Sequence, residues 1–370
     1  MYQTITEGAA RIKAFSGNIT KKDEVFYNTH MKFNRDISVI ALKTYQKLFG
    51  RTLNVMDVLS ATGVRGIRYA LECEGIDKII MNDLNPHAFE LIEENVKLNG
   101  IKNAEVFRLD ACELLSRHKY LIDFVDVDPF GSPISFLDAA ARAVSNKGFL
   151  GITATDTAPL SGTYPKTCRR RYGAVTFRSD IGHEIGLRIL IANIARECAK
   201  YDKGITPVLS FSMRHYFRIF ARIKKTKSAA LKAVDSVGYL WICKKCGSRD
   251  FAKDAGTKKC PSCKGDTLNA GPLWVENIYE KAFLEKMYCI AGTEQEKKFL
   301  EKLIPESEQN TPLYDIHQLA KLSGKTVPKT DNVLEVLSKK GFFAINSITS
   351  GHHIKTDASA KEITGLMKYD

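Results

Sequence analysis

The sequence predicts an α/β fold, in which a doubly wound, mostly parallel sheet is covered by helices and followed by a smaller C-terminal α+β region. Three observations favour this fold. Strand-like apolar runs alternate with helical stretches between Leu53 and Ile223, turns with glycine or aspartate follow several of these runs, and four paired cysteines mark the second region. The 370 residues have room for roughly two to three domains at ~150 residues each.

The first region contains the expected sheet and its helices. We expect an extended lead-in, a helix over residues 36–49, and later helices over 84–99 and 182–200. Apolar residues from Leu84 to Val96 recur with the spacing of one buried helix face. The seven expected strands cover residues 53–59, 78–82, 104–108, 124–128, 148–153, 207–212 and 217–223.

The second region is expected to begin near the basic run 224–228, which is typical of a linker or hairpin. We therefore assign residues 1–225 to a first domain and 226–370 to a C-terminal domain that contains a zinc ribbon at about 238–270. The end of the chain is expected to be winged-helix-like, because helix, helix, strand and turn follow in order from residues 316–322, 330–339 and 342–345.

Charge and composition restrict the partners. The 55 basic and 42 acidic residues give a net charge of +13, which favours a polyanionic partner such as nucleic acid. No apolar run of membrane-spanning length and no signal peptide is evident, so we expect a cytoplasmic protein without a membrane partner. Five scattered cysteines and two close pairs do not resemble a disulfide framework. We expect a monomer.

The turn after the first expected strand, residues 57–66, carries small residues where a helix begins close to a ligand. A dinucleotide fingerprint would place glycines where Leu59 and Ala61 stand, which disfavours a cofactor with a pyrophosphate. Asp83 closes the second strand 20 residues after Gly63, where doubly wound sheets present an acid to ribose hydroxyls.

A second acid follows the third strand. The carboxylate of Asp110, together with the N–H of Ala111, suits the amino group and ring nitrogen of an adenine. Either acid alone is more often a helix N-cap than a ligand. Three successive strand ends with a glycine turn and two acids instead favour a nucleoside cofactor without pyrophosphate, which points to S-adenosylmethionine. Its methyl group is already activated, so the protein has to position an acceptor and manage one proton.

The fourth expected strand runs into the sequence Asp126-Val127-Asp128-Pro129-Phe130. At the ligand-binding edge, the Asp128 carboxylate, with the Pro129 carbonyl, would accept the proton of an exocyclic amine on a nucleobase. Phe130 would stack on that base, which contributes ~1–3 kcal/mol. A tight turn after a buried strand is the alternative interpretation. Asp126 either supports Asp128 or pairs with an arginine, and we prefer the supporting role.

Two Cys-x-x-Cys pairs, Cys243 with Cys246 and Cys260 with Cys263, have the spacing of a zinc ribbon with four thiolate ligands. No histidine or carboxylate completes an open catalytic site, so we expect Zn²⁺ in a structural role. Four reduced thiols or a redox pair are the alternative.

Basic and aromatic residues alternate in two segments, 168–172 and 214–218, which would suit a phosphate backbone near the site. Arg178 lies between them in the sequence. A solvated surface is the alternative for any single arginine. The pair His352-His353 has no neighbouring cysteine and is expected on the surface of the wing.

Over nearly its whole length the chain resembles the archaeal and eukaryotic tRNA guanine-26 N2-dimethyltransferases. Four stretches carry the resemblance: residues 26–28 with 34–36, residues 59–68, residues 126–133 and residues 151–156. The resemblance implies a class I S-adenosylmethionine-dependent methyltransferase fold, tRNA as partner, and two successive methylations of N2 of guanine 26.

The resemblance also implies roles for single residues. Asp128 would be catalytic, and Phe26 and Phe130 would bracket the guanine. The residues implied in binding S-adenosylmethionine are Arg35, Arg65, Asp83, Asp110 and Ala111. Arg35 makes chemical sense as the partner of the methionine carboxylate, because a guanidinium fork matches that anion.

Two other functions stay open at this point. An amino-methyltransferase acting on ribosomal RNA or DNA would share the acids at the strand ends. A zinc-ribbon nucleic-acid-binding protein with a vestigial catalytic domain would keep the cysteines and the basic surface, but the intact set of Asp83, Asp110 and Asp128 argues against it.

Overall fold

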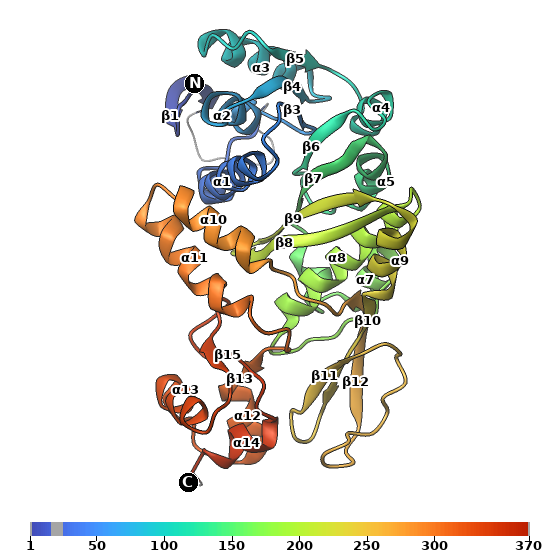
Figure 1. The fold of residues 1–370 in the computed structure, drawn as a ribbon, viewed down its shortest axis with the longest axis vertical. Coiled ribbons are helices and arrows are strands. Elements are labelled where there is room, and N and C mark those ends of the chain that lie inside the picture. The colour runs from blue at the N-terminus through green and yellow to red at the C-terminus, as the bar shows by residue number, and fades with distance from the viewer. Residues whose placement is uncertain (1, 16–24, 369–370) are drawn as a thin grey trace.

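A seven-stranded sheet with helices on both faces forms the centre of the computed structural model, which describes residues 2–15 and 25–368 (Figure 1). The strand order is β5-β4-β3-β6-β7-β9-β8. Strands β5 to β7 are parallel, and the β8–β9 hairpin is antiparallel at one edge. The strands are β3 (Leu53–Asp57), β4 (Ile76–Asn82), β5 (Ala104–Phe107), β6 (Ile122–Val127), β7 (Val144–Ala154), β8 (Lys203–Met213) and β9 (Tyr216–Lys225). The predicted doubly wound, mostly parallel sheet is confirmed.

The chain crosses from one half of the sheet to the other between β3 and β6. After β3 it adds β4 and β5 on one side, and it then returns to place β6 beside β3. In open α/β sheets, ligands bind at this switch point beside the carboxyl ends of the strands. The helices that follow these strands are α2 (Val64–Glu72), α3 (Pro86–Leu98), α4 (Ala111–Arg117) and α5 (Ile134–Ala143).

The first fifty residues differ from the expected simple lead-in. They form a hairpin of β1 (Tyr2–Glu7) and β2 (Ala10–Phe15), then η1 (Thr29–Met31) and the predicted helix α1 (Lys32–Phe49). Gly8 has a φ of +57° in the two-residue turn, a conformation that glycine adopts without strain. The hairpin is fixed to α3, because the Asn95 side chain accepts the Lys13 N–H at 2.7 Å and donates to its carbonyl at 3.2 Å.

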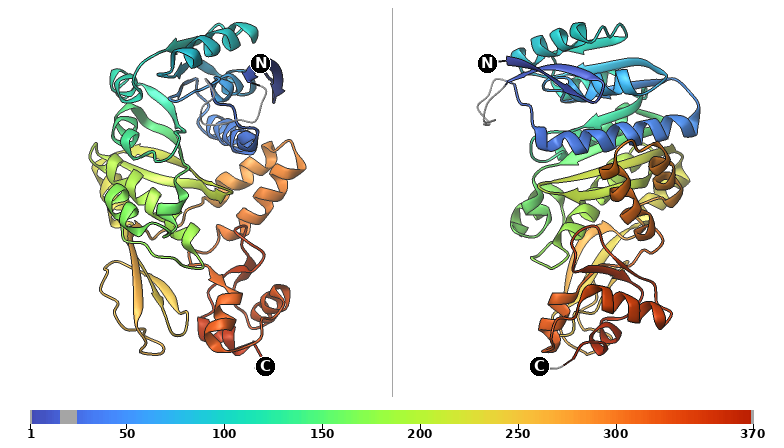
Figure 2. Two further views of the ribbon diagram at one scale, coloured as in Figure 1. Left: turned by 180° about the vertical axis from the view of Figure 1, so that it is seen from behind. Right: turned by 90° about the vertical axis from the view of Figure 1, so that its left-hand side faces the viewer.

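The basic run 224–228 is not a linker. Lys224 and Lys225 complete β9, and the Thr226 hydroxyl caps α9 (Lys227–Asp235) by accepting the Ala229 N–H at 3.1 Å. Two further helices, α10 (Lys281–Ile290) and α11 (Glu294–Glu306), pack as a pair, and α10 lies beside α1 (Figures 1 and 2). One hydrophobic core therefore continues past residue 225 as far as Leu313. The boundary at 225 stays a prediction.

Three further helices lie between β7 and β8. They are α6 (Thr157–Leu160), α7 (Pro165–Tyr172) and the predicted helix α8 (Gly182–Ala199), which packs against β8 and α9. Within the described residues, no helix is both long and apolar enough to cross a membrane.

The C-terminal region contains two small sheets. The first has the order β11-β10-β12, with β10 (Val237–Cys243), β11 (Arg249–Ala252) and β12 (Thr267–Trp274). The end of the chain has its own core and follows the predicted order of helix, helix, strand and turn. It consists of β13 (Tyr314–Asp315), α12 (Ile316–Ser323), α13 (Thr330–Lys339), β14 (Ala344–Asn346), β15 (His353–Thr356) and α14 (Ala360–Gly365).

Candidate active site

The carboxyl ends of β3, β4 and β6 border a cavity of about 770 Å³, which lies within the size range of small-molecule sites. Seven of the predicted site residues line it: Phe26, Arg35, Arg65, Asp83, Asp128, Pro129 and Phe130. These residues come from the segment before α1, from α1, from α2 and from the ends of β4 and β6. The parallel sheet thus brings together side chains that are up to about a hundred positions apart in the sequence.

The turn after β3 opens one side of this cavity. Gly63 has a φ of +78° at the start of α2, and a Cβ there would lie 3.3 Å from Ile92 of α3. Asp83 braces the turn, because its Oδ2 accepts the Ala61 N–H at 2.9 Å and its Oδ1 accepts the Asn85 N–H at 3.0 Å. The carboxylate is part of the cavity wall, where a ribose would be recognised.

The Asp126 carboxylate is fully buried and paired with an arginine. Arg218 of β9 donates to both oxygens, at 2.7 Å each, and Tyr69 donates to Oδ2 at 2.5 Å. Burial alone would raise the pKa of Asp126, but Arg218 and Arg65 outweigh it, so the pKa is lowered. Arg218 therefore does not face a phosphate backbone, as its sequence segment had predicted, because both of its terminal nitrogens donate hydrogen bonds to Asp126.

Asp128 lies two residues after Asp126, just beyond the end of β6, and lines the cavity. Its partner is Arg65 of α2, which donates to Asp128 Oδ2 and also lies 3.7 Å from Asp126. The other bonds of Arg65, to Asn34 Oδ1 and Ser38 Oγ at 3.0 Å, fix it to α1. Arg65 thus connects the buried acid to the acid at the cavity, and both roles considered for Asp126, support of Asp128 and pairing with an arginine, are compatible with this geometry.

A third acid, Asp57, lies beside this pair and was not singled out by the sequence. Burial raises its pKa to about 7, and the Asp126 and Asp128 carboxylates add to the shift while Arg65 opposes it. Asp57 is therefore partly protonated near neutral pH, which lessens its repulsion of the Asp126 and Asp128 carboxylates. The only signal in the sequence was its position at the end of an apolar strand.

Arg35 is held by a residue of the N-terminal hairpin. Glu7 accepts from Arg35 Nε at 2.6 Å and Nη2 at 2.5 Å, and from Tyr27 at 2.8 Å and Arg68 at 3.0 Å. The remaining nitrogen, Arg35 Nη1, has no hydrogen-bond partner among the described residues, although Arg35 lines the cavity. Glu7 therefore orients a guanidinium that keeps one donor group for a ligand.

The Glu7 cluster makes stability depend on pH. Burial would raise the pKa of Glu7, but bonds from Arg35, Tyr27 and Arg68 lower it from 4.5 to about 2. A carboxyl group whose pKa is lowered by folding stabilises the folded state at pH values above its unfolded-state pKa. For Glu7 this contribution to the free energy of unfolding is about 3 kcal/mol, and it is lost as the pH falls toward the folded-state pKa.

We therefore expect Glu7→Gln to lower the free energy of unfolding at pH 6, and we expect its difference from the wild type to shrink between about pH 4.5 and 2. Urea unfolding at pH 6, 4 and 3 measures this difference. Glu90→Gln, a change of an exposed acid on α3, is the control and should show no such convergence. A difference that stays constant with pH would contradict the role of Glu7.

Two aromatic rings stand at the mouth of the cavity. Phe26 and Phe130 meet edge to face, with ring centroids 4.7 Å apart and planes at 83°. Phe130 is 73% exposed, which is unusual for a phenylalanine and leaves its face available to a flat ligand. Pro129 between Asp128 and Phe130 is buried. Behind them, Phe136, Thr155 and Tyr216 complete the wall.

Asp110 and Ala111 stand apart from the other predicted residues. Asp110 caps α4 by accepting the N–H groups of Cys112 at 2.8 Å and Glu113 at 3.1 Å, and neither Asp110 nor Ala111 is part of the cavity wall. The structure thus gives Asp110 the capping role that was its alternative interpretation. Its contact with a cofactor stays a prediction.

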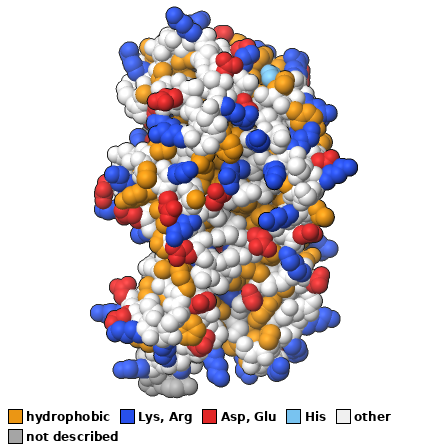
Figure 3. All heavy atoms as spheres, viewed as in Figure 1, with side chains coloured by type: hydrophobic (Ala, Val, Ile, Leu, Met, Phe, Trp, Pro, Cys, Tyr) orange, Lys and Arg blue, Asp and Glu red, His pale blue; other side chains and the backbone are white. Residues whose placement is uncertain are grey.

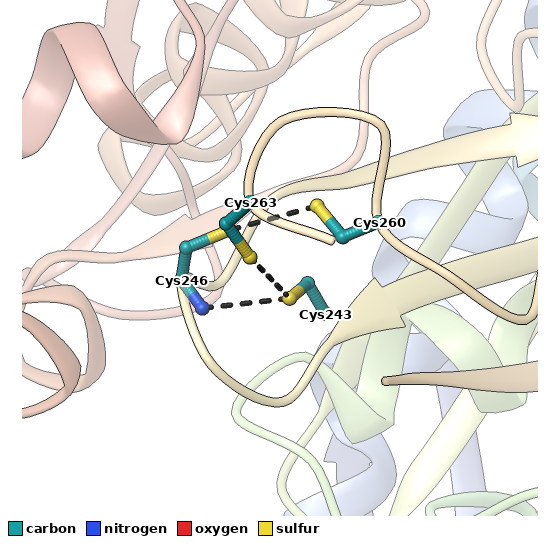
Figure 4. A group of neighbouring side chains, drawn as sticks. All are labelled: Cys243, Cys246, Cys260 and Cys263. Atoms are coloured by element: carbon teal, nitrogen blue, oxygen red, sulfur yellow. Dashed lines mark hydrogen bonds between the residues drawn. The ribbon is translucent and has the colours of Figure 1, made fainter. Parts of the chain in front are cut away.

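The four paired cysteines converge at the tip of the ribbon (Figure 4). The Sγ atoms of Cys243 and Cys263 are 3.4 Å apart, and those of Cys246 and Cys260 are 3.7 Å apart. Ligands of a tetrahedral zinc ion with bonds of about 2.3 Å are separated by roughly 3.8 Å. The Cys243 sulfur also accepts the N–H groups of Lys245 and Cys246, as in a zinc knuckle. The donor set therefore fits a structural Zn²⁺.

Comparison with known proteins agrees with this geometry. A family model described as N2,N2-dimethylguanosine tRNA methyltransferase matches residues 5–368. A tRNA (guanine(26)-N(2))-dimethyltransferase of Methanobrevibacter smithii is 37% identical, with 99% of this chain and 97% of that protein covered. A tRNA (guanine(26)-N(2)/guanine(27)-N(2))-dimethyltransferase of Aquifex aeolicus is 34% identical over 99% of this chain and 96% of that protein. Among solved structures, Trm1 from Pyrococcus horikoshii with S-adenosyl-L-methionine has a TM-score of 0.88 and 32% identity, covering 99% of this chain and 100% of that one.

Proposed function

Because the chain belongs to the N2,N2-dimethylguanosine tRNA methyltransferase family, we propose that it transfers methyl groups from S-adenosylmethionine to the exocyclic N2 of guanine 26 in tRNA, first giving N2-methylguanosine and then N2,N2-dimethylguanosine. One observation supports the proposal most directly. The Asp128 carboxylate and the exposed Phe130 ring line the same cavity, beside the turn that follows β3. This arrangement suits a flat base with an amine to be deprotonated.

The residues of the cavity fit S-adenosylmethionine. Asp83 would accept the ribose hydroxyls, and the free nitrogen of Arg35 would bind the methionine carboxylate. Arg65 lines the same cavity, and Asp110 and Ala111 would approach the adenine from the start of α4. When bound, the cofactor supplies an activated methyl group, so the protein needs no nucleophile of its own.

Asp128 would hold and deprotonate the target amine. The amine of guanine is a poor nucleophile, because its lone pair is delocalised into the ring. A carboxylate and the Pro129 carbonyl that accept its N–H groups would favour the attacking geometry and take the proton as the new bond forms. Arg65 would orient Asp128 through their ion pair, and Asp126 with Arg218 would hold Arg65 in place.

Phe26 and Phe130 would hold the guanine once it has left its stack. In the structure they touch edge to face, so a base could lie between the two rings only if one ring turns aside. Extruding a base from a folded RNA costs a few kcal/mol, and stacking on an aromatic face returns ~1–3 kcal/mol. After the first transfer, the monomethylated amine would turn its remaining hydrogen toward Asp128.

Mapping of the product tests the proposal. Unmodified tRNA is incubated with the protein and S-adenosylmethionine, digested with a nuclease, and its fragments are analysed by mass spectrometry. We expect dimethylguanosine at position 26 and none in a tRNA whose guanine 26 is replaced by adenine. Ribosomal RNA and DNA are incubated in parallel, and methylation confined to them, or no methylation at all, would overturn the proposal.

The tRNA would contact basic surfaces on both regions. Arg169, Arg170 and Arg171 of α7 are exposed, as are Arg178 and Arg214. In the β8–β9 turn, Arg214 is held 2.7 Å from His30 at the rim of the cavity. Lys and Arg side chains are spread over the whole face seen in Figure 3, from the sheet to the C-terminal region. The C-terminal residues 226–370 would act as a tRNA-binding domain beside these arginines, with phosphate contacts giving most of the affinity.

Zinc would hold the ribbon against the rest of the C-terminal region. Gly247, with a φ of +75°, turns the first knuckle, and a Cβ there would lie 2.6 Å from Leu319 of α12, so the knuckle packs directly on that helix. Structural zinc contributes ~10–16 kcal/mol to the folding of isolated fingers.

We expect Cys260→Ser to lose the metal of the cysteine cluster and to unfold the ribbon, because three thiolates cannot close the tetrahedron. Cobalt substitution measures the loss, since thiolate ligands give Co²⁺ an intense near-ultraviolet absorption. The exposed Cys289, changed to serine, is the control and should keep that absorption. An unchanged spectrum in Cys260→Ser would contradict the four-cysteine site.

A further inference from the structure

Three side chains that could bind a metal converge in the C-terminal region, apart from the cysteine cluster. They are Asp315, His352 and His353, and their ligand atoms all lie within 4.8 Å of one another. They come from the meeting point of β13, β15 and the start of α12, in the lower part of Figure 1. His352 and His353 were expected on the wing surface, but His353 is only 13% exposed and both rings turn toward Asp315.

The backbone fixes this convergence. Asp315 and His353 are directly opposite each other in the antiparallel pair of β13 and β15. The carbonyl of His352 accepts the Ile316 N–H at 3.1 Å, so the residue before β15 is anchored as well. Neither histidine can therefore move away from Asp315 without opening this small sheet.

Two of the three side chains, Asp315 and His353, also have their second polar atom engaged. Oδ1 of Asp315 accepts the N–H groups of His317 at 2.8 Å and Gln318 at 3.1 Å as the cap of α12, which leaves Oδ2 free. Nδ1 of His353 lies 3.0 Å from the Thr349 hydroxyl. Its buried Nε2 has no partner at hydrogen-bond distance and angle among the described residues, although the backbone of Asp180 interacts with the ring. Histidines that bind metals are commonly held in this way, with one nitrogen on an oxygen and the other free for the ion.

The free atoms are spaced for a shared ion. Asp315 Oδ2 lies 3.5 Å from His352 Nε2 and 3.6 Å from His353 Nε2. These distances exceed an N–H···O hydrogen bond, which is about 2.7–3.2 Å. They approach the separation of about 3.3–3.4 Å between ligands of a tetrahedral ion with bonds of 2.0–2.1 Å.

We propose that Asp315, His352 and His353 form a second metal site, which binds Zn²⁺ through one carboxylate oxygen and two imidazole nitrogens. Two imidazoles and a carboxylate suit Zn²⁺ and its borderline neighbours, whereas Mg²⁺ and Ca²⁺ prefer oxygen alone. Three protein ligands leave a fourth position to water, and the His352 side chain is 41% exposed, so solvent reaches the cluster. The ion would fasten the turn before β15 to the start of α12.

Zinc binding to the full-length chain tests the site. The protein is stripped with a chelator and dialysed against increasing zinc concentrations, and bound zinc is measured by mass spectrometry. We expect two zinc ions per chain for the wild type and one for Asp315→Asn or His353→Ala. Asparagine caps helices about as well as aspartate, so Asp315→Asn removes the ligand charge while α12 keeps its cap. Circular dichroism and thermal unfolding verify that each variant is folded.

Two controls make the result specific. His87→Ala changes an exposed histidine on α3 and should still bind two ions. Cys260→Ser should keep one ion, and with Co²⁺ this ion should give only the weak visible absorption of nitrogen and oxygen ligands. A wild type that binds a single ion, or two ions retained by both Asp315→Asn and His353→Ala, would overturn the proposal.

Discussion

Asp128→Asn is expected to lower the rate of methyl transfer by about 10²- to 10⁴-fold, because asparagine cannot accept the proton of the target amine. The side chain keeps its size, so the cavity wall should persist. Single-turnover transfer of labelled methyl to tRNA measures the rate, while calorimetry and filter binding measure the affinities for cofactor and tRNA. We expect both affinities to stay within a few-fold of the wild type.

Asp77→Asn is the matched control for this experiment. Asp77 lies in β4 at the opposite, amino-terminal edge of the same sheet and is exposed, so its replacement should leave the rate unchanged. Full activity of Asp128→Asn would remove Asp128 from the reaction. A loss of cofactor binding equal to the loss of rate would instead assign Asp128 to the binding of S-adenosylmethionine.

Arg218→Met is expected to destabilise the protein by about 3–5 kcal/mol, because it leaves the Asp126 carboxylate buried without its main partner. Both side chains of this pair are fully buried, and Arg218 also donates to Thr153 at 3.0 Å and Ser38 at 3.1 Å. The pKa of Asp126 should rise as its partner is lost. The midpoint of urea unfolding measures the destabilisation.

Two further variants show whether that destabilisation comes from the unpaired buried charge. Arg117→Met removes an arginine that is 58% exposed and paired with Glu113 within α4, and it should change stability by less than about 1 kcal/mol. The double variant Asp126→Leu with Arg218→Met removes both charges and should recover part of the loss, since a buried pair can be replaced by apolar residues. Equal stability of Arg218→Met and the wild type would contradict the importance of the pair.

The strands and three long helices could be predicted because their patterns are local. A parallel sheet buried on both faces gives apolar runs such as those of β3 and β6, and helices with one buried face show periodic apolar residues. Helices α10 and α11 were missed, although Thr293 and Glu296 form a capping box that marks the start of α11. Their docking on α1 depends on contacts between segments some 250 residues apart, which no local pattern records.

Arg218 shows where a local pattern misled. The alternation of basic and aromatic residues in 214–218 predicts an exposed basic strand face, but most of β9 is buried on both faces because it lies inside the sheet. The burial of the Arg218 guanidinium could be predicted only by knowing that Asp126, on another strand of the sheet, is its partner. Glu7 was missed for the same reason, since its partners Tyr27, Arg35 and Arg68 come from three other segments.

By itself, the sequence determined the strands of the central sheet and the helices between them, the acids at the strand ends and the four-cysteine cluster, because each of these depends on residues close together in the chain. The tertiary structure decided which charges are paired: Asp126 with Arg218, Asp128 with Arg65, and Glu7 with Arg35. It also brought Asp315 beside His352 and His353. The attraction between two charged side chains is strong only when they lie a few ångströms apart, and only the folded chain establishes which residues are that close.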